Sequence, residues 1–484
     1  MLDDHVLPRD GVVAVMKRDC PTCVLVGPLV ADLVRSGDIA SVVSQDDASF
    51  PAGVDVVDDS LLDLSWILGI ETVPTLVRLA GGDVIDRIEG WSRPHWSAFL
   101  GLDDLAPELP AYRPGCGSLS VDPVRAEELR IRHGAGALGS RRLELGEAED
   151  DLEAMWDRGW SDGLPVVPPT LGRVLRMLSG TTRSPDDVVA VVPPDLVDCT
   201  VEKVAINAVM AGCRPEYLPV VLASVEAACT DAFNMHGLLA TTYFSGPLVI
   251  VNGPVTKGIG MNSGGNVLGQ GNRANSTIGR ALQLVVRNVG GGRPGPGGID
   301  RAALGNPGKV GWCFAEDEAT SPWEPLSVWR GLPAGQSAVT LFAAAGVTPV
   351  VDQASRTPES LARSFAAVLR GVGHPKLLHS FDAILVVCPE HARVFRDAGW
   401  DRTRLMAELD ALLTIDCTSL VKGVDGIDEG LPASLTGVHL GKFREGGLLI
   451  VHAGGTAGMF SAVIGGWVSG QVGSEPVTWS VQWP

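Results

Sequence analysis

Asp19-Cys20-Pro21-Thr22-Cys23 is the stretch that decides the fold of the N-terminal part of the chain. Residues 12–16 before it read as a buried strand, and residues 24–35 after it carry apolar side chains at helical spacing. Cys20 is therefore expected at the N-terminus of a helix, where free backbone N–H groups and the helix dipole stabilise a thiolate. Because Cys23 lies one turn further on, the two sulfur atoms can form a disulfide. The motif predicts a redox pair in which Cys20 attacks and Cys23 resolves.

Half of a zinc site is the alternative interpretation of two close cysteines. Zinc would need a second pair of ligands at similar spacing, and the sequence has no other CxxC pair and no HxxxH pair. We therefore expect no metal at Cys20 and Cys23.

The elements that follow this motif resemble the thioredoxin fold in their order. A strand, a helix, the segment Thr72-Val73-Pro74-Thr75, a hairpin and a closing helix are expected at residues 39–44, 61–68, 72–76, 76–88 and 94–100. The resemblance covers a domain of residues 8–102. It implies a redox-active disulfide between Cys20 and Cys23 with no further cofactor, and a cis proline, Pro74, that faces the cysteines and contacts the substrate. Asp19 and the Pro21-Thr22 pair depart from the residues common in that family, which leaves the direction of electron flow open.

The composition is that of a large globular protein. The chain has 484 residues, 45% hydrophobic and 20% charged, enough for about three average domains. A net charge of −19 argues against a nucleic-acid partner, because phosphate binding needs clustered Lys and Arg. The first residues lack a signal-peptide pattern and no apolar run reaches membrane-spanning length, so we expect a cytoplasmic protein with no membrane partner. Nine cysteines fit reduced thiols better than a disulfide framework.

Residues 103–158 are predicted to form a connector between two domains. Its first part is rich in proline, and its second part combines helical spacing with dense charge. Cys116 lies between two glycines and is sterically open, so it is either a third redox thiol within reach of Cys20 or an ordinary exposed loop cysteine. The triplet Cys116-Gly117-Ser118 resembles part of the Sec-Gly-Ser-Cys signature of UGSC-type selenoproteins.

Residues 159–484 are predicted to form a large glycine-rich α/β domain with a division into two subdomains near residue 335. Strand and helix patterns alternate as βα units over residues 338–413, with strands at 338–343 and 348–351, and a further strand is expected at 238–243. Three segments resemble an uncharacterised bacterial family related to the UGSC-type proteins; they are residues 159–170, 201–207 and 211–213. That resemblance implies an architecture but no known reaction.

A loop rich in glycine and asparagine at residues 262–275 is the candidate for substrate binding. Glycines let the backbone come close to a ligand, and free N–H groups at the start of a helix expected at 276–286 favour an anion. The residues expected to bind the substrate are Asn262, Arg273, Asn275 and Ser276. The last two are also the candidates for the helix cap. A structural turn that merely needs glycine is the alternative.

The catalytic candidates of this domain are a histidine before a glycine, a cysteine near carboxylates, and a Pro-Glu-His triplet after a strand. They are His236, Cys313 with Glu316, and Glu390 with His391. His236 suits acid–base work, with a structural histidine as the alternative. Cys313 and Glu316 would meet only across a turn. The triplet lies where ligands of such sheets gather and matches the family pattern, whereas Cys388 does not, so Glu390 and His391 are preferred.

The sequence therefore predicts a redox enzyme in which Cys20 and Cys23 pass electrons to a cysteine further along the chain, Cys116 or Cys313. The substrate would be a small anion containing sulfur or another soft element. The other expected partners are an external dithiol or thioredoxin reductase and further copies of the chain in a homo-oligomer. Two alternatives stay open: an organometal-cleaving or soft-metal-binding thiol protein, and a non-redox lyase or hydrolase with His/Glu acid–base catalysis.

Overall fold

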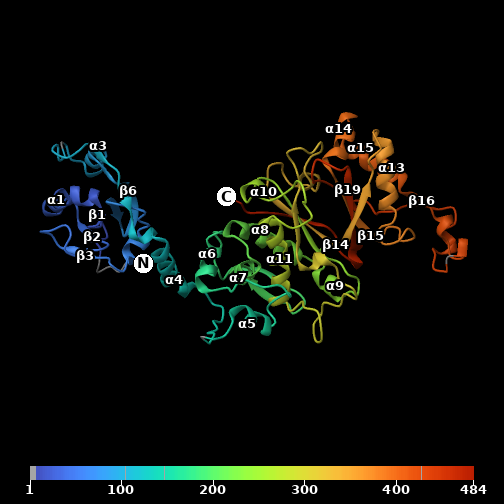
Figure 1. The fold of residues 1–484 in the computed structure, drawn as a ribbon, viewed down its shortest axis with the longest axis horizontal. Helices are drawn as coiled ribbons and strands as arrows, with labels where there is room; N and C mark the ends of the chain where they lie inside the picture. Colours follow the sequence, from blue (N-terminus) through green and yellow to red (C-terminus); the bar gives the residue numbers. More distant parts are fainter. Residues whose placement is uncertain (1–6, 104, 147, 427, 484) are drawn as a thin grey trace. The chain divides into compact units, whose positions relative to one another are not determined.

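The computed structural model describes residues 7–103, 105–146, 148–426 and 428–483, which form mixed α/β structure (Figure 1). The chain divides into two compact units, Met1–Gly136 and Ala137–Pro484, which we call unit 1 and unit 2. None of the described helices is both long enough and apolar enough to cross a membrane.

Unit 1 is built on a five-stranded mixed sheet in the order β3-β2-β1-β5-β6. The strands β1, β2 and β3 are parallel, and the antiparallel hairpin β5–β6 adds to the other side of β1. The strands are β1 (Gly11–Met16), β2 (Ser41–Ser44), β3 (Val56–Asp58), β5 (Thr75–Ala80) and β6 (Asp83–Glu89). The helices are α1 (Pro21–Ser36), α2 (Asp63–Ile67), α3 (Arg93–Leu100) and α4 (Pro123–Gly134).

The first strand and helix form as the pattern around the cysteines predicts. β1 is buried from its second residue to its last, and Cys20 is the N-cap of α1. Pro21 suits the first helical position, because the N–H that it lacks would have no partner within the helix. The helix ends at Gly37, whose φ of 89° is left-handed and favours glycine. Its apolar face, which includes Val26 and Val30, joins the core of unit 1.

The segment expected as a connector is divided between the two units. Two short strand pairs bind its first part to unit 1: β7 (Trp91–Ser92) with β8 (Tyr112–Arg113), and β4 (Thr72–Val73) with β9 (Cys116–Gly117). Gly115 permits the second pairing, because a Cβ there would lie 2.4 Å from the Thr72 side chain. The helix α4 then continues unit 1 to Gly136, well past residue 102.

Unit 2 contains a seven-stranded mixed sheet. Along its main path of six strands, the pattern of parallel and antiparallel pairings is the same from either edge. That path is β13-β12-β14-β19-β15-β18, and β20 pairs with β14. β13 and β12 are parallel, as are β18 and β15, while β14 and β19 are antiparallel to their neighbours. Two similar three-stranded halves therefore meet at β14 and β19. The strands are β12 (Gly246–Asn252), β13 (Trp312–Ala315), β14 (Ala338–Val351), β15 (Phe381–Val387), β18 (Leu448–His452), β19 (Phe460–Val468) and β20 (Val477–Ser480).

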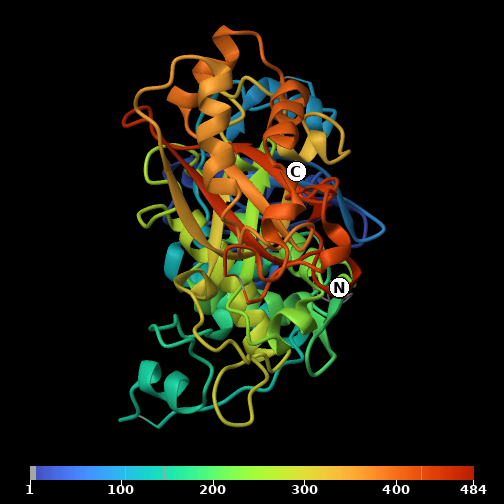
Figure 2. The ribbon, with the colours of Figure 1, turned by 90° about the vertical axis from the view of Figure 1, so that its right-hand side faces the viewer.

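The sheet of unit 2 curls around one apolar core. Alternate residues of all six strands on the main path, such as Leu248, Phe342 and Ile384, belong to a single buried cluster. The edge strands meet at their ends, where the Asp317 N–H donates to the His452 carbonyl at 2.8 Å. Helices pack on the outer faces of both halves, and Figure 2 shows the strands between them. These helices are α7 (Val201–Ala211), α8 (Leu218–Ala228) and α11 (Arg273–Asn288) on one half, and α13 (Pro358–Leu369), α14 (Pro389–Asp397) and α15 (Arg402–Leu412) on the other.

Three elements of unit 2 differ from expectation. The run 238–243 is not a strand, because Asn234 caps the helix α9 (Met235–Ala240) there. Residues 338–351 form one strand where two were expected. The sheet takes strands from both sides of residue 335, so no boundary falls there.

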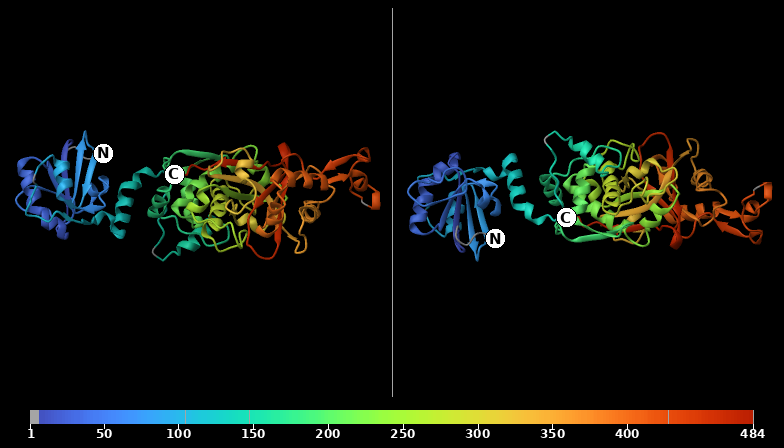
Figure 3. Two further views of the ribbon diagram at one scale, coloured as in Figure 1. Left: turned by 90° about the horizontal axis from the view of Figure 1, so that it is seen from above. Right: turned by 90° about the horizontal axis from the view of Figure 1, so that it is seen from below.

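The remaining elements are short. A hairpin-like pair, β16 (Thr414–Asp416) and β17 (His439–Gly441), projects from the sheet of unit 2 (Figure 3). The others are β10 (Val188–Val192), β11 (Val197–Thr200), α5 (Asp151–Asp157), α6 (Leu171–Leu178), α10 (Val255–Gly258) and α12 (Leu326–Trp329).

Candidate functional site

The thiol pair of unit 1 lies at the junction of β1 and α1. The Cys20 sulfur accepts a hydrogen bond from the Cys23 N–H at 3.4 Å, and its thiol donates to the Val73 carbonyl at 3.5 Å. Both cysteines are fully buried. The Val73–Pro74 bond is cis, as expected, and Pro74 is buried next to the carbonyl that Cys20 contacts.

The two thiols of this pair differ in acidity. Hydrogen bonding with the Cys23 side chain is the largest cause that lowers the pKa of Cys20, to about 5, and it outweighs the opposing effect of burial. Cys116 and the backbone of Cys23 and Thr22 lower it further. Burial instead raises the pKa of Cys23. Near neutral pH, Cys20 is therefore mainly a thiolate, while Cys23 keeps its proton. The hydrogen bond from the Cys20 thiol to Val73 belongs to the protonated form of Cys20.

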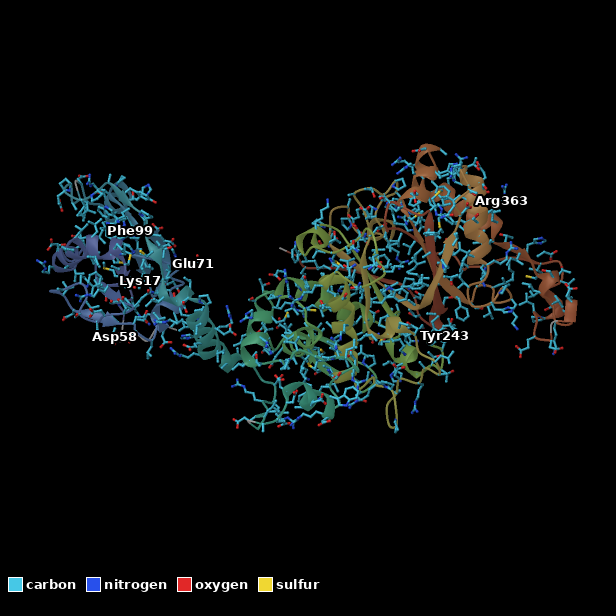
Figure 4. The ribbon with its side chains drawn as sticks, in the orientation of Figure 1. Lys17, Asp58, Glu71, Phe99, Tyr243 and Arg363 are labelled. Atoms are coloured by element: carbon cyan, nitrogen blue, oxygen red, sulfur yellow. The ribbon has the colours of Figure 1, made fainter. Side chains whose placement is uncertain are left out.

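Cys116 lies beside this pair although it is distant in the sequence. β9 places Cys116 opposite Val73, whose carbonyl contacts Cys20. Burial and the interaction with Cys20 raise the pKa of Cys116, against the charge of Lys17. Lys17, labelled in Figure 4 beside sulfur atoms of unit 1, donates to the Gly117 carbonyl at 2.8 Å. Three thiols thus come together in unit 1, and Cys116 is the one that is partly exposed.

Cys313 and Glu316 are both buried. Cys313 lies on β13 among the residues that pack under the helices, and burial raises its pKa. The Glu316 carboxylate accepts from Asn252 Nδ2 at 2.6 Å and from the Leu326 N–H at 2.7 Å, with the Arg402 guanidinium at 3.9 Å. Burial also raises the pKa of Glu316. The contacts of Glu316 join the ends of neighbouring strands, and they include none with Cys313.

The histidine candidates occupy opposite environments. His236 is exposed on α9. His391 is fully buried, with Nε2 at 2.9 Å from the Asp352 carbonyl and Nδ1 at 2.7 Å from Ser461 Oγ. The neighbouring Glu390 accepts a hydrogen bond from the backbone N–H of residue 459 at 2.6 Å. The Pro-Glu-His triplet is thus divided, because Glu390 holds a loop while His391 points into the protein.

The polar groups of the glycine loop are largely engaged by the loop itself. The Asn262 N–H donates to Asn275 Oδ1 at 3.0 Å, and Asn275 Nδ2 donates back to the Asn262 carbonyl at 2.8 Å. Asn272 is the cap of α11, so the expected cap at Asn275 or Ser276 is wrong. Ser276 is exposed, and Arg273 donates to the carbonyl at the end of α7. These contacts favour the structural interpretation of this loop.

A cavity of about 550 Å³ in unit 2 was not expected from the sequence. It lies between α6, α7 and residues 138–145, and its lining is mainly apolar, with Met155 and Trp160 among the walls. The charged residues of its lining are Arg141, Arg142, Lys203 and Glu202. The Glu202 carboxylate already accepts from the N–H groups of residues 139 and 140 at 3.0 and 3.1 Å. The Lys203 ammonium donates to the Asp198 carbonyl at 2.8 Å. The lining carries three cationic side chains and one carboxylate, and this excess of positive charge favours a small anionic ligand.

Two segments that are far apart in the sequence meet at this cavity. Residues of 159–170 and of 201–207 both line it. The first segment is held to α11 by Arg280, whose guanidinium binds the Asp162 carboxylate through two hydrogen bonds of 2.8 Å. Both segments were singled out in the sequence, but the sequence did not predict that they line one cavity.

All nine cysteines are free thiols in the structure. Within the described ranges, no group of three or more His, Cys, Asp or Glu side chains could hold a metal ion. A scan against protein-family models and a search of the curated proteins found no match for this chain.

Proposed function

We propose that the protein is a thiol–disulfide oxidoreductase and that its unit 1 is a thioredoxin-like domain. The observation that carries the proposal is the Cys20 sulfur at the N-cap of α1, with a lowered pKa and with Cys23 and Cys116 beside it. The strand order supports the domain type, because the cysteine pair follows the middle strand of the sheet and an antiparallel hairpin completes its other side.

The proposed reaction begins with attack of the Cys20 thiolate on one sulfur of a disulfide. A bond forms between the two sulfur atoms, the substrate S–S bond breaks, and the leaving thiolate takes a proton from solvent. Cys23 or Cys116 then loses its proton and attacks the Cys20 sulfur, which releases the second substrate thiol. Two electrons pass to the substrate, and an external dithiol or thioredoxin reductase restores the thiols of unit 1.

The two resolving thiols have different roles in this proposal. Cys23 is the nearer one, since its N–H already contacts the Cys20 sulfur, but it is fully buried. Cys116 is partly exposed and is held in place by β9. We therefore assign resolution of the substrate to Cys23. Cys116 then loses its proton and attacks the Cys20 sulfur of the Cys20–Cys23 disulfide, Cys23 leaves and takes up a proton, and an outside dithiol reduces the Cys20–Cys116 disulfide at the partly exposed Cys116.

A small anionic substrate is the second part of the proposal. The cavity of unit 2 supports it better than the glycine loop does, because Arg141, Arg142 and Lys203 bring positive charge to mainly apolar walls. Such a cavity suits an oxidised-sulfur compound that carries a carboxylate or a similar group.

The test uses the reduced full-length chain carrying Cys388→Ser, which removes the other cysteine at a strand–helix junction, with glutathione disulfide, which is anionic, and no other reductant. We expect two glutathione thiols released per chain and a disulfide at Cys20 detected by mass spectrometry. Cys20→Ser should slow the release by on the order of 100-fold. The matched control is Cys199→Ser, since Cys199 is a buried thiol whose pKa burial raises to about 12, and it should keep the wild-type rate. An unchanged rate in Cys20→Ser would overturn the proposal.

A further inference from the structure

A second cysteine of the protein lies at a strand–helix junction. β15 ends at Val387, Cys388 is the N-cap of α14, and His391 lies in the first turn of that helix. Cys388 does not line the cavity of unit 2, and no part of the proposed reaction of Cys20 uses it. The thiol and the imidazole are therefore two buried reactive groups without an assigned role.

The ring of His391 is fixed in one orientation. Because a carbonyl oxygen only accepts, the contact with Asp352 places a hydrogen on Nε2. Nδ1 therefore faces the Ser461 hydroxyl at 2.7 Å, and Ser461 Oγ also accepts from the Cys388 N–H at 3.1 Å. Phe365 packs edge-on against the ring at 5.6 Å between centroids. Groups from β19, from α13 and from Asp352, which directly follows β14, thus hold the imidazole close to Cys388.

The charges around this pair favour a thiolate and an imidazolium. Burial opposes ionisation of Cys388, but hydrogen bonding and charge interactions with His391, together with Ser461, outweigh it and lower the pKa of the thiol. Burial likewise opposes protonation of His391, yet Cys388 and Asp352 raise its pKa. The Asp352 carboxylate has its own pKa lowered, because hydrogen bonds from Ser364 and Ser355 outweigh its burial. It therefore stays ionised near the ring.

A glycine-rich segment lies against Cys388. Gly454 lies against it, so that a Cβ at that position would be 3.8 Å from the Cys388 Cβ. Its φ of +121° favours glycine. The next residue, Gly455, lies against Gly265 of the glycine loop, where a Cβ would be only 3.2 Å from the Gly265 Cα. Residues 454–458 are partly or fully exposed, so the segment that lies against Cys388 at Gly454 reaches solvent.

We propose that Cys388 and His391 form a second nucleophilic site, which attacks the sulfur of small disulfides. Cys388 forms a bond to one substrate sulfur, the substrate S–S bond breaks, and the proton of His391 Nδ1 passes through the Ser461 hydroxyl to the leaving thiolate. The product is a mixed disulfide at Cys388 and one free thiol, and a dithiol reduces it back. Disulfide exchange fits this site better than acyl transfer, since it requires a thiolate and a proton donor but no oxyanion hole.

The experiment isolates this site from unit 1. The full-length chain carries Cys20→Ser and Cys116→Ser, and the probes are iodoacetamide and a small nitrobenzoate disulfide. Mass spectrometry follows modification of each cysteine between about pH 5 and pH 9. We expect Cys388 to react at pH 6 on the order of 100-fold faster than Cys199 and Cys417, two buried cysteines of unit 2. The disulfide probe should release one nitrobenzoate thiol per chain.

Variants test the partner of the thiol. His391→Gln should slow modification of Cys388 at pH 6 about tenfold and move the onset of the reaction to higher pH. The matched control is His439→Gln, an exposed histidine of β17, which should leave the profile unchanged. If the His391→Gln variant does not fold, the pH profile of Cys388 modification in the chain with His391 intact still tests the proposal. A Cys388 that reacts no faster than Cys199, or only in the ordinary thiol range of pH, would overturn the proposal. Either result leaves the test of Cys20 unaffected.

Discussion

Both units place a cysteine at the same point of a strand–helix junction, with a proline as the first residue of the helix. In unit 1 this cysteine is Cys20, and in unit 2 it is Cys388. The residue three positions on differs, because it is Cys23 in unit 1 and His391 in unit 2. The same backbone arrangement therefore gives one sulfur a thiol as neighbour and the other an imidazole.

This difference separates two kinds of chemistry. A neighbouring thiol can form a disulfide, so Cys20 and Cys23 can store and release two electrons. A neighbouring imidazole can hold or give a proton but cannot take the sulfur's bond, so Cys388 depends on an outside dithiol to be reduced. The helix N-terminus stabilises a thiolate in both, and the residue in the first helical turn decides how the mixed disulfide is resolved.

The largest expected effect concerns the buried carboxylates of the two units. Glu316 in unit 2 faces Arg402, whereas Asp59 in unit 1 binds only neutral donors from residues 64 and 65. Glu316→Ala leaves the buried Arg402 guanidinium with backbone carbonyls as acceptors but without this carboxylate, and it should lower the free energy of unfolding by about 3–5 kcal/mol. Asp59→Ala should cost about 1–3 kcal/mol. Urea unfolding measures the free energy of unfolding of both variants. An equal decrease in the two would show that the ion pair with Arg402 does not stabilise the fold beyond neutral hydrogen bonds.

Removal of both resolving thiols is the next test. In Cys23→Ser/Cys116→Ser the Cys20 thiolate can still attack a disulfide, but no thiol beside it can release the product. With Cys388→Ser added to remove the other nucleophilic thiol, turnover with glutathione disulfide and a dithiol should fall on the order of 100-fold, and mass spectrometry should find glutathione on Cys20. In chains that keep Cys388, its own reaction with the disulfide should not change. Rapid turnover without accumulation of that adduct would show that a different thiol resolves it.

Removal of Cys23 alone should change the acidity of Cys20. Hydrogen bonding with Cys23 is the largest cause of the low pKa of Cys20, about 5, so Cys23→Ala should raise it. An increase of one pKa unit reduces the thiolate fraction about tenfold below that pKa. The pH profile of iodoacetamide modification at Cys20 measures the change. Leu33→Ala on the same buried face of α1 is the control and should leave the midpoint in place.

The smallest effect concerns two buried histidines with opposite shifts. Burial lowers the pKa of His452, whereas contacts raise that of His391. Around pH 6.5 His452 binds fewer protons in the folded than in the unfolded state, so it makes the free energy of unfolding decrease as the pH falls. His452→Gln should flatten the pH dependence of unfolding between about pH 5 and pH 7. If the free energy of unfolding depends on pH equally steeply in that variant, the pH dependence comes from other titrating groups.

The strand, the helix and the thiol pair of unit 1 could be predicted because their determinants are local. Apolar runs and the spacing of Cys20 and Cys23 lie within one stretch of sequence. The position of Cys116 could not be predicted with the same certainty, since it depends on the pairing of β9 with β4 and on the close approach that Gly115 permits. The two glycines that flank Cys116 were the sequence feature that indicated a thiol within reach of Cys20.

The contacts of unit 2 depend on segments far apart in the chain. The spacing of Cys388 and His391 is visible in the sequence, but the groups that orient the ring are distant in the chain: Asp352 directly follows β14, and Ser461 lies on β19. The cap of α11 was misplaced because several Asn and Ser residues near its start could each accept the hydrogen bond. The cavity between α6 and α7 could not be predicted either, because its walls come from segments that are separate in the sequence.

The strand order of unit 2 has a consequence for fragments of the protein. A chain that ended near residue 370 would keep β13, β12 and β14, but the edge of β14 that pairs with β19 and β20 would be left without a neighbour. The inner apolar face of that half would also be uncovered. Such a fragment presents an open edge and half of a core, which is the arrangement that draws identical chains together into swapped dimers or aggregates.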